Sequence, residues 1–305
     1  MATPAPIPQT KPEGPTASQP DNVAGILWIL LSVVGASAMS VAVRELSGTI
    51  DSRMIVTLRS AVILAGLLAV LPFVPRMREM RFSRPGLHIL RGGLIGLSTH
   101  LGFYTLANLP LATTTVLFFT APIFATILSV IFQKQRVGPR RAAAVAAGFI
   151  GAIIILRPGL QPFEPAMLAA LASSAMFAIA LTLSRGLVAA DGANSAYASS
   201  VVITLLVSLP LAAPVWAFPD TGWTWFILGI VVVGGALRGY ADIVAYAKGE
   251  ASVLAPITYL RLVLIGGAGY VFYAEVPDRP TIIGAAIIIA ATLYIAQREA
   301  ALRKR

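Results

Sequence analysis

Residues 236–261 read ALRGYADIVAYAKGEASVLAPITYLR and join two long apolar runs of the chain. The stretch therefore lies at or within a membrane, yet it carries five charged side chains, Arg238, Asp242, Lys248, Glu250 and Arg261. A charge near the centre of a bilayer costs about 3 kcal/mol or more, so it usually faces a cavity or a partner. We interpret the stretch as one polar wall of a cavity inside a helical membrane protein. The alternative is a charged cytoplasmic loop, which suits Lys248 and Glu250 better than Asp242.

Arg238 and Asp242 are four residues apart, so on a helix they share one face and can neutralise each other. Tyr246 lies one turn further along that face. Arginine suits a carboxylate and aspartate suits an ammonium group. We therefore predict that Arg238, Asp242 and Tyr246, together with Arg261, contact a small polar substrate. The alternative is that Arg238 and Asp242 only neutralise each other at the cytoplasmic mouth.

The composition excludes several other classes of protein. Of 305 residues, 57% are hydrophobic and 12% are charged, against about 25% charged in soluble domains. The chain has no cysteine and two histidines, which excludes a cysteine site or a three-histidine zinc site, so we expect neither metal nor cofactor. The net charge of +10 comes from residues between apolar runs, which indicates membrane orientation and no nucleic-acid partner.

Ten apolar runs predict ten transmembrane helices. They cover approximately residues 24–43, 55–74, 92–109, 111–132, 142–157, 166–185, 195–216, 223–247, 251–273 and 281–297. A shift of 140 positions superimposes the first five runs on the last five. Because each half has an odd number of spans, the second half enters the membrane from the opposite side. We therefore predict an all-α integral membrane protein of two inverted five-helix repeats; the alternative is the rough regularity of any ten-helix protein.

The predicted divisions of the chain follow from these runs. Residues 1–22 are rich in proline and form a disordered cytoplasmic tail. The first repeat covers residues 23–157 and the second 158–297, and residues 298–305 form a basic cytoplasmic tail. With the N-terminus inside, most Lys and Arg residues lie on the cytoplasmic side, as in other membrane proteins. This predicts a multi-pass protein of the bacterial inner membrane, with both termini cytoplasmic.

Further candidate substrate-binding residues come from the third and eighth runs. His100 and Tyr104 share a helix face, and a histidine at membrane depth is a candidate proton carrier or substrate ligand. The shift of 140 places His100 opposite Tyr240. The alternative for His100 is a hydrogen bond to a neighbouring helix. We assign Arg59, in the second run, a structural role.

Aromatic and flexible side chains complete the predicted site. They are Trp28 and Met39 of the first run, Phe118 of the fourth and Tyr259 of the ninth. Trp28 can instead be an interface anchor, and an aromatic stripe is often simple packing. Pro122 and Pro256 are expected to kink the fourth and ninth helices.

Catalytic motifs are missing from the sequence. It has no H-E-x-x-H and no P-loop. We expect no Ser–His–Asp set either, because His88 falls in the basic segment before the third run. These absences favour a protein that is not an enzyme.

The pattern of two five-helix halves resembles the drug/metabolite transporter superfamily, specifically its EamA type. Short motifs carry the resemblance in part: LANLPLA at 106–112 and YAKGEAS at 246–252 before the fourth helix of each half, and Ala274-Glu275 before the last helix. At the equivalent position of the first half, before its fifth helix, the chain has Lys134-Gln135, which departs from the family pattern. Within the superfamily the chain looks most like the YddG group of amino-acid exporters.

The resemblance implies a basket of ten helices around a central cavity, lined mainly by the first, third, fourth, sixth, eighth and ninth. It also implies a secondary transporter that exports amino acids, aromatic and other apolar ones included, by alternating access. The predicted partners are amino acids and the lipid bilayer, with a monomeric protein. A multidrug exporter of lipophilic cations, a nucleotide-sugar carrier and a channel are the alternatives. If protons drive the cycle, His100 and Asp242 are the groups to suspect.

Overall fold

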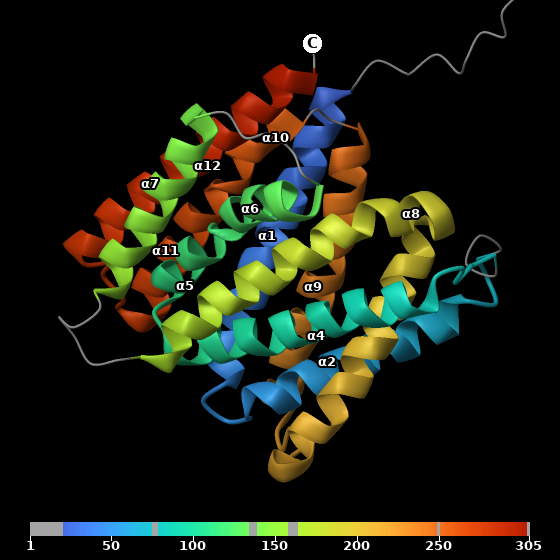
Figure 1. The fold of residues 1–305 in the computed structure, drawn as a ribbon. Coiled ribbons are helices and arrows are strands. Elements are labelled where there is room, and N and C mark those ends of the chain that lie inside the picture. Colours follow the sequence, from blue (N-terminus) through green and yellow to red (C-terminus); the bar gives the residue numbers. More distant parts are fainter. Residues whose placement is uncertain (1–20, 75–78, 134–138, 158–163, 249–250, 304–305) are drawn as a thin grey trace, which may run out of the picture.

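The computed structural model describes residues 21–74, 79–133, 139–157, 164–248 and 251–303, and within these ranges the regular structure is helical (Figure 1). The α-helices are α1 (Asn22–Leu46), α2 (Ser52–Val70), α4 (Pro85–Asn108), α5 (Leu111–Phe118), α6 (Ala121–Gln133), α7 (Pro139–Leu156), α8 (Pro165–Ala212), α9 (Gly222–Lys248), α10 (Ala251–Thr258), α11 (Leu260–Tyr273) and α12 (Arg279–Arg303). A short 3₁₀ helix, η1 (Ala213–Val215), follows α8.

Seven helical segments in the described part of the chain are long and apolar enough to cross a membrane. They are Asn22–Leu46, Ser52–Val70, Leu111–Leu128, Pro165–Ser184, Gly186–Val215, Gly222–Asp242 and Arg279–Gln297, and Ala142–Leu156 is a shorter apolar helix. The third predicted run lies in α4, and the ninth is divided between α10 and α11. The protein is thus an all-helical membrane protein, and the count of ten spans stays a prediction.

The described part of the chain begins and ends close to a helix end, and the predicted tails stay predictions. Residues 1–20 lie outside the described residues, but α1 already begins at Asn22, with the Asp21 carboxylate accepting the Ala24 amide at 3.0 Å. At the other end α12 continues to Arg303, through most of the predicted tail at 298–305. The predicted boundary at 157–158 adjoins residues 158–163, which lie outside the described ranges.

Two predicted helices are divided rather than kinked. The fourth predicted run forms two helices: α5 ends at Phe118, and α6 begins at Ala121. Pro122 is the second residue of α6, where its missing N–H breaks no helical bond. The ninth run divides in the same way at Tyr259, three residues after Pro256. Divided helices of this kind line substrate sites in many transporters.

The most extensive helix contacts join α4 to α8, α1 to α9 and α7 to α12; Figure 1 shows α7 and α12 side by side. Adding 140 to the residue numbers places α4 on α9 and α1 on the first part of α8, so the first two pairs are equivalent to each other. The same shift places α7 on α12, so the third pair joins equivalent helices of the two halves. This is the pattern expected of two related halves, whose inversion stays a prediction.

Glycines permit the close approach of two of these pairs. A Cβ added to Gly35 of α1 would lie 3.0 Å from the carbonyl oxygen of Gly234 in α9. A Cβ added to Gly234 would lie 2.7 Å from the carbonyl oxygen of Gly35. Between α7 and α12, a Cβ on Gly284 would lie 2.6 Å from the Gly151 carbonyl oxygen. Small residues are a common means of helix association in membranes.

The sixth and seventh predicted helices both fall within α8 and are separated by a kink at Gly192. This residue has φ 84° and ψ 162°, outside the helical region. A side chain is strained at such a φ, so glycine permits the bend. The bend places Asp191 and Ser195 beside the segment that precedes α4, where they accept backbone hydrogen bonds from Ser83 and Arg81.

Asp278 caps α12 and makes the stability of this helix start depend on pH. Its carboxylate accepts the Thr281 amide at 3.0 Å and pairs with Arg157. The hydrogen bonds from Thr281 and then Arg157 lower the pKa of Asp278 from 3.8 to about 2. Because the folded pKa is depressed, the stabilisation is present above about pH 4 and is lost as the pH falls toward 2.

We therefore expect the difference in melting temperature between the wild type and Asp278→Asn to be greatest above pH 4 and to shrink toward pH 2. Thermal unfolding in detergent at pH 6, 4, 3 and 2 measures this difference. A difference that stays constant over the series would contradict the role of the charged carboxylate.

Candidate functional site

The predicted pair of Arg238 and Asp242 lies on α9 where this helix meets α1. Asp242 accepts a short hydrogen bond from the hydroxyl of Ser32, and its other carboxylate oxygen is 3.8 Å from Arg238 Nε. Ser32 is buried, whereas the Arg238 and Asp242 side chains are 34% and 38% exposed. The two charged side chains are therefore only partly covered by protein, and their contact with a substrate stays a prediction.

Two further arginines approach this pair from other helices. Arg261 of α11 donates to Ser40 Oγ of α1 at 3.1 Å, and the charges of Arg238 and Asp242 act on it. Arg59 of α2 packs against Gly235 of α9 and is close enough to Arg238 for their charges to interact. We call Arg59, Arg238, Arg261 and Asp242 the arginine cluster.

The arginine cluster combines three positive groups with one negative group. Nε of Arg59 and Nε of Arg261 are buried without a hydrogen-bond partner among the described residues. The Arg59 guanidinium also lies 5.8 Å from the centre of the Phe103 ring, a cation–π contact. Buried donors of this kind require a partner in the working protein, and an anionic group of a substrate would provide one.

Arg59 is the residue of this cluster that our sequence interpretation missed. We had assigned it a structural role because Asp51 and Arg53 are close to it in sequence. In the structure those two residues pair with each other, Arg53 Nη2 lying 2.9 Å from Asp51 Oδ2. An arginine deep within an apolar run was the available signal, since such a residue usually faces a polar interior.

One aromatic pair joins α1 to α9, and a second lies where the divided helices α5–α6 and α10–α11 are interrupted. Trp28 of α1, one turn before Ser32, meets Tyr240 of α9 edge to face with ring centres 5.7 Å apart. Phe119 and Tyr259 have ring centres 4.7 Å apart. These two residues stand at the breaks of the divided helices and are 140 positions apart. The two predicted halves therefore meet at equivalent residues, two positions from Arg261.

Phe118 and Met39 pack in the interior instead of joining the cluster. Phe118 contacts both large apolar cores and faces Gly102 of α4. Met39 is 5% exposed in the core and adjoins Gly234. A helix face alone does not reveal whether it meets a cavity or another helix, so a substrate contact at these two residues stays a prediction. Phe119 is the aromatic residue of this helix that contacts Tyr259.

His100 lies apart from the arginine cluster, between α4 and α8. Its Nε2 is 2.8 Å from Ser208 Oγ, and the Ser208 hydroxyl donates to the Thr204 carbonyl oxygen. Nε2 therefore carries the proton, and Nδ1 is buried without a partner among the described residues. This is the alternative arrangement, a histidine bonded to a neighbouring helix. Tyr104 is 39% exposed, and the Tyr246 side chain lies outside what the structure describes.

Glu275, from the Ala274-Glu275 motif, connects the ends of several helices. Its Oε2 accepts the amide of Leu111 at 2.7 Å, at the first residue of α5, and its Oε1 is 3.6 Å from Arg44. Arg44 of α1 also donates to the carbonyl oxygen of Ala107 at 2.6 Å. A carboxylate at a helix N-terminus is favourable, so this acid holds α1, α5 and α11 together.

The chain matches the model of the EamA-like transporter family twice, over residues 23–157 and 164–297. The chain belongs to this family. It is 33% identical over 282 residues to an S-adenosylmethionine uptake transporter of Rickettsia felis, an alignment that covers 91% of this chain and 94% of the relative. As an EamA-like transporter, it is a multi-pass membrane protein that moves a small molecule.

Other relatives of this EamA-like transporter have different substrates in their names. A riboflavin transporter of Vibrio cholerae is 28% identical, with 90% of this chain and 93% of the relative covered. A pseudopaline exporter of Pseudomonas aeruginosa is 27% identical, with 90% and 96% covered. A crystal structure at 19% identity matches with a TM-score of 0.63 over 93% of this chain and 99% of the other, which supports the fold alone. These relatives do not support the narrower resemblance to YddG exporters.

The EamA-like transporter also contains a Ser–His–Asp constellation that we expected to be absent. His88 lies in the first turn of α4 and is buried, with Nδ1 2.7 Å from Ser199 Oγ and Nε2 2.9 Å from Asp191 Oδ2. The expectation failed because α4 begins at Pro85, before the apolar run. Hydrolase triads place the serine at Nε2 and the aspartate at Nδ1, so this reversed, buried set instead joins α4 to α8.

Proposed function

We propose that this transporter carries a zwitterionic metabolite with an aromatic or heteroaromatic group across the bacterial inner membrane by alternating access. S-adenosylmethionine is the first candidate. The observation that carries the proposal is the arginine cluster, which offers several guanidinium groups and one carboxylate within a membrane-spanning bundle. An α-amino acid group requires both charge signs in this arrangement.

Each part of S-adenosylmethionine has a counterpart on these helices. The α-carboxylate suits the arginines, and the ammonium group suits Asp242. The adenine ring and the sulfonium cation suit aromatic faces, which the pairs Trp28–Tyr240 and Phe119–Tyr259 supply. The likeness to S-adenosylmethionine uptake transporters adds independent support. Inward transport is therefore the first direction to test.

The second candidate is export of aromatic amino acids, the function that the sequence alone suggested. The same arginines and Asp242 suit any amino-acid headgroup, and the Phe119–Tyr259 pair suits an aromatic side chain. Lipophilic cations are less favoured, because they have no carboxylate for the three arginines to bind. Riboflavin has no ammonium group for Asp242.

Transport into proteoliposomes separates these candidates. Purified protein would be tested with labelled S-adenosylmethionine, phenylalanine, riboflavin and tetraphenylphosphonium. We expect saturable S-adenosylmethionine uptake that is accelerated by unlabelled substrate on the opposite side, because such counterflow requires a carrier. Uptake of phenylalanine alone would favour the second candidate. Uptake of riboflavin or of the cation alone would overturn the zwitterion proposal, and flux without saturation would favour a channel.

The orientation of the chain is a related proposal. Both termini are placed in the cytoplasm because most basic residues then fall on the cytoplasmic side. We expect a green fluorescent protein fused after Arg305 to fluoresce and alkaline phosphatase at the same place to be inactive. The opposite result would contradict the cytoplasmic position of the C-terminus and the orientation predicted from the basic residues.

A further inference from the structure

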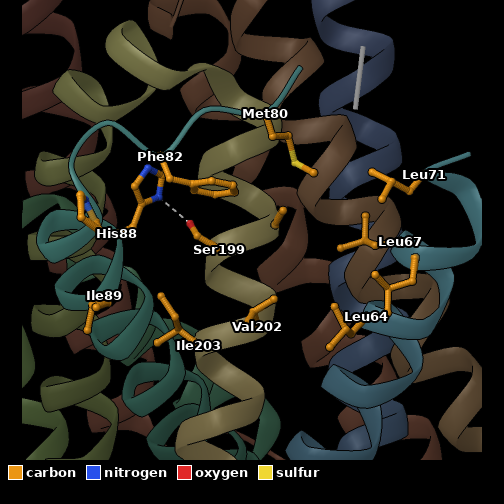
Figure 2. Close-up of a pocket in the computed structure, with 13 residues that line it drawn as sticks. Leu64, Leu67, Leu71, Met80, Phe82, His88, Ile89, Ser199, Val202 and Ile203 are labelled. Atoms are coloured by element: carbon orange, nitrogen blue, oxygen red, sulfur yellow. Dashed lines mark hydrogen bonds between the residues drawn. The ribbon is translucent and has the colours of Figure 1, made fainter. Parts of the chain in front are cut away.

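An apolar cavity of about 350 Å³ lies between α2, α4 and α8, away from the arginine cluster (Figure 2). Leu64, Leu67 and Leu71 of α2 form one wall and Val202 of α8 forms another. Phe82, from the segment that precedes α4, also lines it. The neighbouring side chains Leu68 and Ile89 are 59% and 62% exposed. The cavity therefore lies at the apolar perimeter of the bundle.

The polar atoms near the cavity are already bonded to protein. Both ring nitrogens of His88 have partners, Ser199 and Asp191, and Figure 2 shows the bond to Ser199. The Phe82 ring meets the His88 ring edge to face, with centres 5.2 Å apart. The cavity consequently presents carbon atoms, which suit a hydrocarbon chain better than a polar metabolite.

The segment that precedes α4 brings basic residues next to the cavity. The segment 79–84, EMRFSR, supplies Met80 and Phe82 to the lining and carries the exposed residues Arg81 and Arg84. Its single acid is Glu79, so the segment is net positive. The Arg81 amide donates to Ser195 at 3.0 Å, which holds the segment against α8. The cavity thus has an apolar interior and adjoins a segment with a net positive charge.

We propose that this cavity binds an acyl chain of an anionic phospholipid from the cytoplasmic leaflet, with the phosphate at Arg81 and Arg84. Basic residues beside membrane helices attract anionic lipids of that leaflet. The chain's own residues 1–20 suit the cavity poorly, since they contain six prolines and few large apolar side chains. The proposal does not depend on which metabolite is transported.

The charge part of the proposal is tested with the unaltered protein and one double variant. Lipid exchange in detergent, followed by native mass spectrometry, would compare phosphatidylglycerol with phosphatidylcholine of identical chains. We expect phosphatidylglycerol to be preferred, and Arg81→Gln with Arg84→Gln to weaken its binding about fivefold per arginine. Arg140→Gln, an exposed arginine on α7, is the matched control and should leave binding unchanged. Equal retention of the two lipids by the wild type would overturn the proposal.

The position of the acyl chain is tested by filling the cavity. Val202→Phe adds apolar volume inside it, whereas Val233→Phe adds the same volume at an exposed position of α9. We expect bound phosphatidylglycerol to fall at least fivefold in Val202→Phe and to be unchanged in Val233→Phe. Unchanged binding in both variants would overturn the proposal. A wild-type protein that is dimeric in phosphatidylcholine nanodiscs, and that only Val202→Phe dissociates, would also overturn it. The cavity would then be an interface between two copies of the chain.

Discussion

Asp242→Asn is expected to lower the affinity for the transported zwitterion about 30-fold. The change removes the negative group of the arginine cluster and leaves Arg238 without its carboxylate partner. Truncating one member of a buried charge pair costs about 2–5 kcal/mol. Because the two side chains are about one third exposed, we take the lower end, about 2 kcal/mol, which corresponds to about 30-fold. Concentration-dependent uptake into proteoliposomes measures this loss.

Two matched variants make the result specific. Asp220→Asn removes an exposed acid in the segment before α9 and should leave uptake unchanged. Ser32→Ala removes a hydrogen bond to Asp242 but keeps its charge, so a smaller loss is expected. Thermal unfolding and size-exclusion profiles establish that each variant is folded. Normal uptake by folded Asp242→Asn would show that the substrate binds elsewhere, even if the transport activity itself is as proposed.

Gly234→Ala is expected to destabilise the protein by about 1–3 kcal/mol, although alanine is the better helix former. The new Cβ would lie 2.7 Å from the Gly35 carbonyl oxygen and 3.3 Å from Met39 Cβ. Neither can move away easily, because one is backbone and the other is held in the core. Helices α1 and α9 would move apart, which would weaken the hydrogen bond from Ser32 to Asp242. The unfolding midpoint in detergent measures the effect, and substrate affinity should fall in parallel.

Gly229→Ala on the same helix provides the control with the opposite sign. A Cβ at Gly229 meets no atom within 4 Å, so the change should add up to about 1 kcal/mol of helix propensity. We expect the unfolding midpoint of Gly229→Ala in detergent to equal or exceed that of the wild type. If Gly234→Ala were as stable as Gly229→Ala, the close approach of α1 and α9 would not be what positions the site.

Periodicity and composition were sufficient for much of the fold. The apolar runs predicted an all-helical membrane protein, and the spacing of Arg238 and Asp242 predicted their shared face. Pro122 and Pro256 predicted kinks in the fourth and ninth helices, whereas the structure divides both helices, at Phe119 and at Tyr259. A single proline indicates only that regular bonding is interrupted, and neighbouring helices decide whether a bend or a break results.

The sequence by itself determined which charges fall within apolar runs, and the cost of burying a charge in a bilayer predicts that these face a polar interior. Only the tertiary structure decided which of them meet. Arg59 lies in the arginine cluster, whereas His100 contacts Ser208. His88 contacts Asp191 and Ser199, which lie on opposite sides of the bend at Gly192. These contacts join residues on different helices. They follow from how closely the helices approach and how they are rotated, which the packing of glycines and side chains across the whole bundle determines.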